Sequence, residues 1–106
     1  MTETTRKHPE DRREELVEAA MWLAETGGLY NMTGHLIAQR AKCQRTLINH
    51  YFFSMANLQD IVIRRALRNK VWAIVAQAHA RGDSQLDHMT IEQRKELSEY
   101  IAESLS

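Results

Sequence analysis

The chain has 106 residues, a hydrophobic fraction of 43%, and 14 basic against 14 acidic side chains, so its formal net charge is zero. This length supports one domain with a modest core, to which dimerisation would add stability. Scarce glycine and proline in a chain rich in helix formers predict an all-α fold. The lone Cys43 excludes an intrachain disulfide. No apolar run reaches the ~20 residues of a membrane span, and the polar N-terminus is not signal-like, so we expect a cytoplasmic protein with no membrane contact.

Residues 1–8 are polar and are predicted to form a flexible arm. A first helix is predicted from Pro9, because proline suits a first-turn position and the acidic residues after it favour the positive end of the helix dipole. Its apolar residues recur at helical spacing. The pair Gly27-Gly28 is expected to end this helix, because glycine accepts the left-handed conformation of a C-terminal cap.

Two short helices are predicted next. The first is expected over residues 33–41, with the hydroxyl of Thr33 capping its free amides. The second is expected over residues 44–50. Only Lys42-Cys43 lies between them, and two short helices joined by so brief a turn make a helix-turn-helix unit.

A long fourth helix is predicted from its cap, Ser54, to about His79. Its apolar residues fall on two faces, which indicates two packing neighbours. A turn is expected over residues 81–84, and a fifth and final helix opens at Thr90, with Gln93 as its capping-box partner. The expected architecture therefore has five helices, of which the fourth is long and the fifth is a short C-terminal one.

No aspartate or glutamate occurs between Glu25 and Asp60, although 26% of the residues are charged. The window between them carries a net charge of +3 from Arg40, Lys42 and Arg45. A surface that excludes carboxylates and keeps cations suits contact with phosphates. A chance gap on an ordinary helical surface is the alternative, and the helix-turn-helix pattern inside the window argues against it.

The window and the helix before it share a spaced pattern: two alanines, a glycine, a threonine cap, Ile-Ala, then Tyr-Phe-x-Ser and a leucine. Its main positions are Leu16, Ala19, Ala20, Gly28, Thr33, Ile37, Ala38, Ile48, Tyr51, Phe52, Ser54 and Leu58. This stretch resembles the N-terminal DNA-binding domain of TetR-type transcriptional regulators, without a gap. The resemblance implies a helix-turn-helix head that binds DNA.

The chain departs from the family pattern around the turn and the second short helix. Lys42 stands where glycine is usual, and a lysine in a left-handed turn costs about 1 kcal/mol unless the turn takes another shape. Cys43 replaces a valine, Gln44 a serine, Asn49 a tyrosine and Met55 a lysine that touches the DNA backbone in the family. These exchanges bear on the phosphate contacts rather than on the fold.

Residue chemistry predicts the individual contacts. The helix expected over residues 44–50 is the only one short and polar enough to enter a major groove, where arginine can bond guanine, and glutamine or asparagine can bond adenine. The predicted base contacts are Gln44, Arg45, Thr46, Asn49 and His50. The predicted phosphate contacts are Arg6, Lys7, Thr33, Lys42, Tyr51 and Ser54.

A helix-turn-helix head over residues 9–58 and a helical dimerisation region over residues 59–106 are expected within one compact domain. Two helices can form a dimer seam but cannot enclose a cavity for a drug-sized ligand. The predicted dimer contacts are Leu67, Val71, Ile74, Leu97, Tyr100 and Ile101. We therefore predict a homodimeric repressor of a pseudo-palindromic operator in double-stranded DNA, with no cofactor and no small-molecule effector.

One alternative stays open. The same scaffold could be a protein-binding module, such as an inhibitor or antirepressor of a mobile element, that has lost DNA contact; Asn49 and Met55 favour this hypothesis. An enzyme is not expected, because the sequence offers no carboxylate pair or nucleophile constellation. No metal site is expected either, because the histidines lack ligand spacing and only one cysteine is present.

Overall fold

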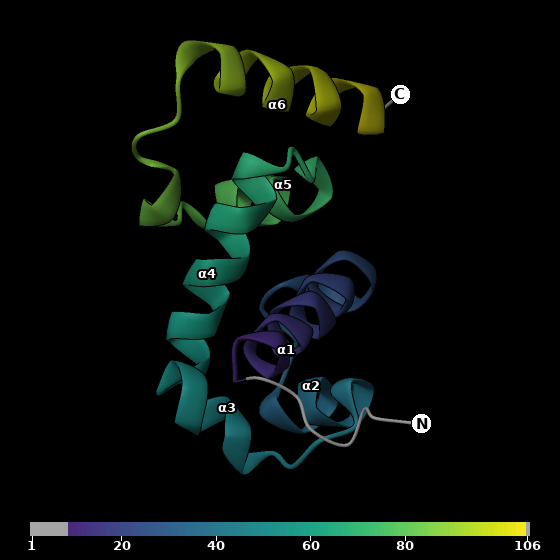
Figure 1. Cartoon of the computed structure of the whole chain (residues 1–106). Coiled ribbons are helices and arrows are strands. Elements are labelled where there is room, and N and C mark those ends of the chain that lie inside the picture. The colour runs from purple at the N-terminus through teal and green to yellow at the C-terminus, as the bar shows by residue number, and fades with distance from the viewer. Residues whose placement is uncertain (1–8, 106) are drawn as a thin grey trace.

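The computed structural model describes residues 9–105, which fold entirely into helices and turns, so the all-α prediction is confirmed. The elements in chain order are α1 (Pro9–Leu23), the π-helical turn η1 (Ala24–Gly28), α2 (Gly34–Ala41), α3 (Thr46–Phe52), α4 (Met55–Arg68), α5 (Trp72–Arg81), the 3₁₀ turn η2 (Ser84–Leu86) and α6 (Ile91–Ser104). The helices α2 and α3 lie at one end of the molecule and α6 at the other, while α4 runs along the side between them (Figure 1).

The end of α1 widens into η1, which Gly28 terminates at φ +110°. Gln77 of α5 closes this widened end, because its amide nitrogen donates to the carbonyl of Ala24 at 2.9 Å. Its amide oxygen accepts from the backbone N–H of Leu29 at 2.6 Å. Both backbone residues are fully buried, so Gln77 supplies hydrogen bonds to a carbonyl and an amide that water does not reach.

Three helices begin at the side chains that the sequence predicted as caps. The hydroxyls of Thr33 and Ser54 accept amide protons from the first turns of α2 and α4, at 3.1 and 3.2 Å. Thr90 and Gln93 form a reciprocal capping box at α6, with distances of 3.0 and 2.9 Å. These caps fix where the helix-turn-helix unit begins and where the chain leaves it.

The prediction of one long fourth helix is wrong, because α4 and α5 divide that stretch and the described chain has six α-helices rather than five. The break arises where Lys70 takes φ +60°. The amides of Lys70 and Val71 turn back to the carbonyls of Leu67 and Ala66, at 3.3 and 2.8 Å. The chain is redirected there, so the two apolar faces seen in the sequence belong to two separate helices.

One apolar core joins all six helices, and its largest fully buried side chains include Leu16, Leu29, Ile37, Leu58, Ile63 and Ile74. Helix α1 packs on both α2 and α4. An ion pair between Arg65 and Glu14 also ties α4 to α1. At the far end, α6 packs on α5 after a left-handed turn at Gly82. The core thereby holds α2 and α3 in place from behind.

Candidate nucleic-acid interface

Helix α3 begins at Thr46 rather than at the predicted Gln44, and it extends to Phe52. Ile48 and Phe52 anchor its inner side, each with only 2% of its surface exposed. The five predicted base-contact residues are all exposed, either on α3 or in the turn before it: Gln44, Arg45, Thr46, Asn49 and His50. The structure therefore presents this predicted group to solvent.

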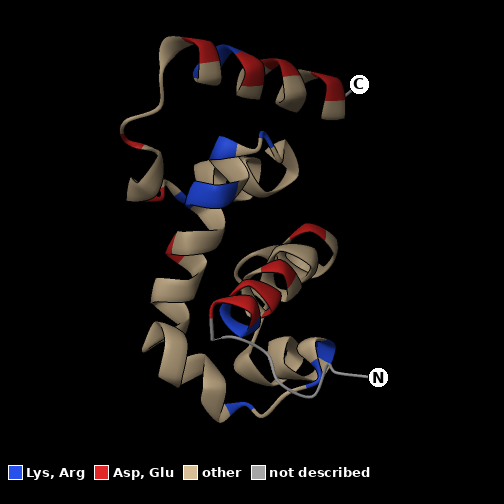
Figure 2. Cartoon of the chain, viewed as in Figure 1, with Lys and Arg blue, Asp and Glu red and all other residues tan. Residues whose placement is uncertain are grey.

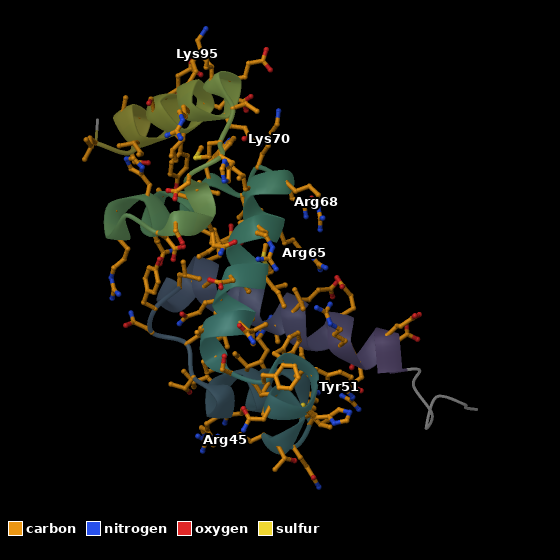
Figure 3. All side chains as sticks on the ribbon, turned by 90° about the vertical axis from the view of Figure 1, so that its left-hand side faces the viewer. Arg45, Tyr51, Arg65, Arg68, Lys70 and Lys95 are labelled. Atoms are coloured by element: carbon orange, nitrogen blue, oxygen red, sulfur yellow. The ribbon has the colours of Figure 1, made fainter. Side chains whose placement is uncertain are left out.

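Arg45 occupies the position just before α3, and its side chain lies along the first turn of α2. A Cβ atom at Gly34 would lie 3.4 Å from Arg45 Nε and 3.6 Å from its Cγ, so glycine leaves the room that this side chain uses. Arg45 is seen at the α3 end of the molecule in Figure 3. Its planar guanidinium can bond O6 and N7 of guanine together.

The turn between α2 and α3 is left-handed at Lys42, with φ +59° and ψ +50°. The amides of Lys42 and Cys43 turn back to the carbonyls of Gln39 and Ala38, at 3.3 and 3.0 Å. This closure satisfies the last carbonyls of α2. The predicted cost of about 1 kcal/mol relative to glycine therefore applies, and the lysine side chain is left exposed.

The predicted phosphate contacts lie at helix starts and at the end of α3. Thr33 and Ser54 accept hydrogen bonds as caps, so each hydroxyl proton stays free to be donated to a phosphate oxygen. Tyr51 is half-buried, and the edge of its ring meets His50 with the ring centres 4.9 Å apart. The remaining two predicted contacts, Arg6 and Lys7, lie outside the described residues.

The helices α2 and α3 and the first turns of α4 carry no carboxylates of their own. Figure 2 shows α2, α3 and the first turns of α4 without acidic residues, whereas the start of α1 and the length of α6 carry many. The acidic start of α1 borders α2, because Glu15 and Glu18 line the same groove as Arg40 and Lys42. The stretch that holds α2 and α3 nevertheless keeps cations and has no acidic residue of its own, which is the charge pattern expected of a nucleic-acid-binding surface.

Phe53 directly follows α3, and the sequence did not single it out. Its side chain is 82% exposed and its φ is +71°, while its neighbour Phe52 is buried. The Phe-Phe pair is the signal that was available, because its second member falls in the turn before the cap Ser54, and turns lie at the surface. Phe53 therefore belongs to the surface beside α3.

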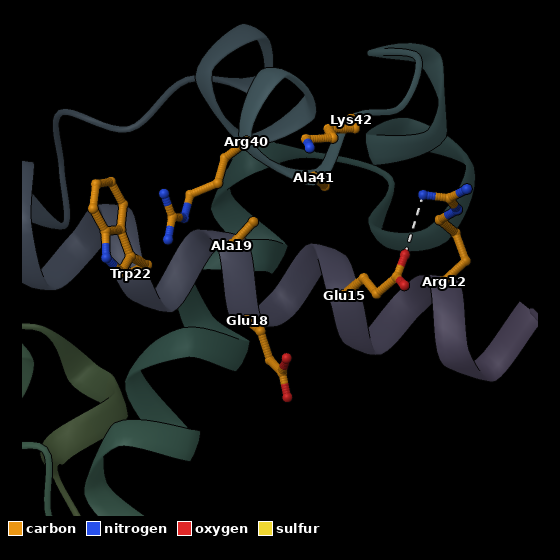
Figure 4. A pocket seen from close by; sticks show the side chains of 8 residues that line it. All are labelled: Arg12, Glu15, Glu18, Ala19, Trp22, Arg40, Ala41 and Lys42. Carbon is orange, nitrogen blue, oxygen red and sulfur yellow. Dashed lines mark hydrogen bonds and ion pairs between the residues drawn. The ribbon is translucent and has the colours of Figure 1, made fainter.

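Arg40, at the end of α2, was also not assigned a role. Its guanidinium lies 3.4 Å from the ring centre of Trp22 on α1, an arrangement that favours cation–π attraction. The pair lines one end of an open groove of about 680 Å³ between α1 and α2 (Figure 4). Arg12 and Glu15, 3.1 Å apart, line its other end. The contact holds α2 against α1, so Arg40 acts in packing.

The six predicted dimer contacts are divided between the core and the surface. Ile74 and Leu97 are 0% and 3% exposed, so both are corrected to core residues of the subunit itself. The physical reason for Ile74 is the break after α4, which turns the buried face of α5 inward onto α4 and η1. Leu97 is buried because α6 packs on α5. The other four residues are half-buried: Leu67, Val71, Tyr100 and Ile101.

Residues 9–105 contain no candidate metal site and no helix that could span a membrane. No three His, Cys, Asp or Glu side chains of this part of the chain are placed to hold a metal ion. Its helices are too short or too polar for any of them to cross a bilayer. Cys43 is half-buried as a free thiol.

Comparison with known proteins relates the chain to a transcription regulator. The chain is 32% identical over 71 residues to the HTH-type transcriptional regulator BetI of Burkholderia thailandensis. The aligned stretch makes up 67% of this chain and 36% of BetI, so the chain spans well under half of that regulator's length. No protein-family model matches the chain, and no solved structure does. The similarity relates the chain to transcription regulators of the helix-turn-helix type.

Proposed function

We propose that this protein is a TetR-like repressor that binds a pseudo-palindromic operator in double-stranded DNA as a homodimer. The observation that carries the proposal is the joint exposure of five side chains suited to base contacts, within a stretch that has no carboxylates: Gln44, Arg45, Thr46, Asn49 and His50. The similarity to an HTH-type transcriptional regulator supports it. One recognition helix would enter the major groove of each half-site, and bound protein would occlude the promoter.

Each exposed side chain suits a particular contact. Arg45 would bond guanine, Gln44 and Asn49 would bond adenine, and Thr46 would meet a thymine methyl group. The phosphate contacts would come from the helix starts and the flanking cations, which position α3 without reading sequence. In the proposal these are Thr33, Lys42, Tyr51 and Ser54, with Arg6 and Lys7 of the arm.

The proposed dimer surface consists of half-buried side chains at the α4–α5 junction and on α6. Leu67 and Val71 contribute the first part, and Tyr100 and Ile101 the second. Residues 9–58 would then act as the DNA-binding head and residues 59–106 as the dimerisation region. The proposal includes no small-molecule effector, because the groove between α1 and α2 is open and lined by charged side chains, unlike a pocket that encloses an apolar ligand.

Selection of bound duplexes from a random pool tests the proposal, and the expected result is an enriched motif with twofold symmetry. Arg45→Ala should then weaken binding to that motif by about 1–3 kcal/mol and relax the base preference at one position in each half-site. Lys95→Ala is the matched control, because it removes an exposed cation at the opposite end of the molecule (Figure 3). Failure to enrich any duplex would reject the repressor and favour the protein-binding module.

A further inference from the structure

Phe52 and Phe53 are adjacent in sequence but have opposite surroundings. Phe52 is 2% exposed and belongs to the core, whereas Phe53 is 82% exposed. A ring that stays in water gains nothing from burial, so packing within the subunit does not account for Phe53. The side chain is therefore available to something outside the subunit.

The backbone at Phe53 is also strained. Its φ of +71° and ψ of −45° lie near the rare γ-turn with positive φ, and away from the left-handed helical values. The turn is fixed on both sides, because Phe53 N donates to Asn49 O at 3.0 Å and Asn57 Nδ2 donates to Phe52 O at 2.9 Å. Glycine would take this turn with less strain. A bulky ring held here by neither packing nor backbone preference points to function.

Phe53 lies between α3 and α4, one helical turn after the exposed Asn49 and His50. It also belongs to the stretch of residues 26–59 that contains no aspartate or glutamate. A duplex that accepts α3 in its major groove offers thymine methyl groups and deoxyribose carbons to a ring at the groove edge. An apolar protein partner would not require a stretch that keeps cations and excludes carboxylates, so DNA is the partner that fits both features.

We propose that Phe53 is a DNA-contacting residue, whose ring packs against a thymine methyl group or a deoxyribose beside the bases that α3 reads. This inference rests on the proposed function and adds a specificity determinant to it. The strain at this position then has a reason, because the turn directs the ring toward the DNA rather than toward the core.

Substitution of Phe53 separates affinity from stability. Phe53→Gly should raise Tm by about 5 °C, because it relieves the backbone, and should weaken binding to the enriched duplex about tenfold. Phe53→Tyr keeps the ring and should bind like the wild type. Ile91→Ala is the matched control, because Ile91 is 86% exposed at the opposite end of the molecule and should not affect binding.

Wild-type affinity in Phe53→Gly would overturn this inference and leave the proposed function intact. A weaker affinity together with a lower Tm would also overturn it, because it would indicate a structural role. If the wild type enriches no duplex, the proposed function fails and this inference fails with it. Replacing thymine by uracil in the duplex distinguishes the two contacts. If Phe53 contacts the methyl group, the loss of affinity caused by uracil and the loss caused by Phe53→Gly should overlap. If it contacts a deoxyribose, the two losses of affinity should add.

Discussion

Lys42 combines two opposed effects in one side chain. Its left-handed φ of +59° costs about 1 kcal/mol relative to glycine, whereas its exposed ammonium group can attract phosphates. We expect Lys42→Gly to raise the free energy of unfolding by about 1 kcal/mol and to weaken DNA binding evenly across sequences. The slope of log affinity against log salt should fall by about one, measured by titration at several salt concentrations.

Lys70 provides the control for that prediction, because it also has a positive φ, +60°, but lies between α4 and α5, away from α3. Lys70→Gly should also stabilise the fold, less the small contribution of its exposed ion pair with Glu96. It should leave the salt slope unchanged. Equal changes in salt slope for both variants would show that Lys42 has no special place at the DNA.

Tyr30 links stability to alkaline pH. Its burial, and then the hydrogen bond that its hydroxyl donates to Asp83 at 3.1 Å, raise the pKa of Tyr30 to about 12. The folded state therefore favours the neutral phenol. This contribution to stability is complete below the unfolded value of about 10 and is lost as the pH rises through about 12.

Tyr30→Phe should accordingly lose less stability than the wild type as the pH rises from about 10 to 12. Denaturant unfolding at a series of pH values measures this difference, although the variant starts from a lower stability because it lacks the hydrogen bond to Asp83. Parallel losses in the two proteins would show that Tyr30 is not the group responsible.

Gln77 forms hydrogen bonds between α5 and the end of α1. Gln77→Leu would remove its side-chain hydrogen bonds to the buried carbonyl of Ala24 and the buried amide of Leu29. We expect a loss of about 2 kcal/mol or more in the free energy of unfolding, measured with urea. Gln39→Leu, an exposed glutamine on α2, should change it by no more than about 0.5 kcal/mol. Similar losses in both variants would contradict this account.

The helix starts were predictable because each depends on a local hydrogen bond, as at Thr33, Ser54 and Thr90. The end of α4 was not, because Asn69-Lys70 contains neither the glycine nor the proline that normally marks such a turn. The break at Lys70 depends instead on the packing gained when α5 folds back onto η1. The prediction of Ile74 as a dimer contact was wrong for the same reason, because Ile74 lies beyond that break.

In the candidate site too, features with local causes were predictable from the sequence, and features that depend on tertiary packing were not. The exposure of the five base-contact residues follows from the periodicity that buries Ile48 and Phe52, so the sequence was enough to predict it. The positions of Arg40 over Trp22 and of Arg45 beside Gly34 depend on how α1, α2 and α3 pack together. Phe53 has a backbone conformation that is set by the capped start of α4 rather than by its own preference.

On the scale of the whole molecule, charge is separated by position. Residues 60–81 carry a net charge of +4 and residues 82–106 a net charge of −4, although the chain as a whole is neutral. The two regions meet where Lys70 of the α4–α5 junction lies 3.4 Å from Glu96 of α6. The acidic helix therefore lies at the end away from α3, where it does not repel a duplex bound there (Figure 2).

The proposed function requires a dimer that holds its two α3 helices about 34 Å apart, which is one turn of DNA. Tyr100→Asp puts a charge on the proposed seam and should convert a sedimenting dimer into a monomer, with an unchanged helical circular dichroism spectrum. Operator affinity should fall about tenfold or more, because each half-site would then bind alone. Ser98→Asp is the matched control, because it adds the same charge at an exposed position of the same helix. This seam would be ruled out if the wild type sediments as a monomer or if the Tyr100→Asp variant remains a dimer. In either case, the two recognition helices would need another contact to hold their spacing.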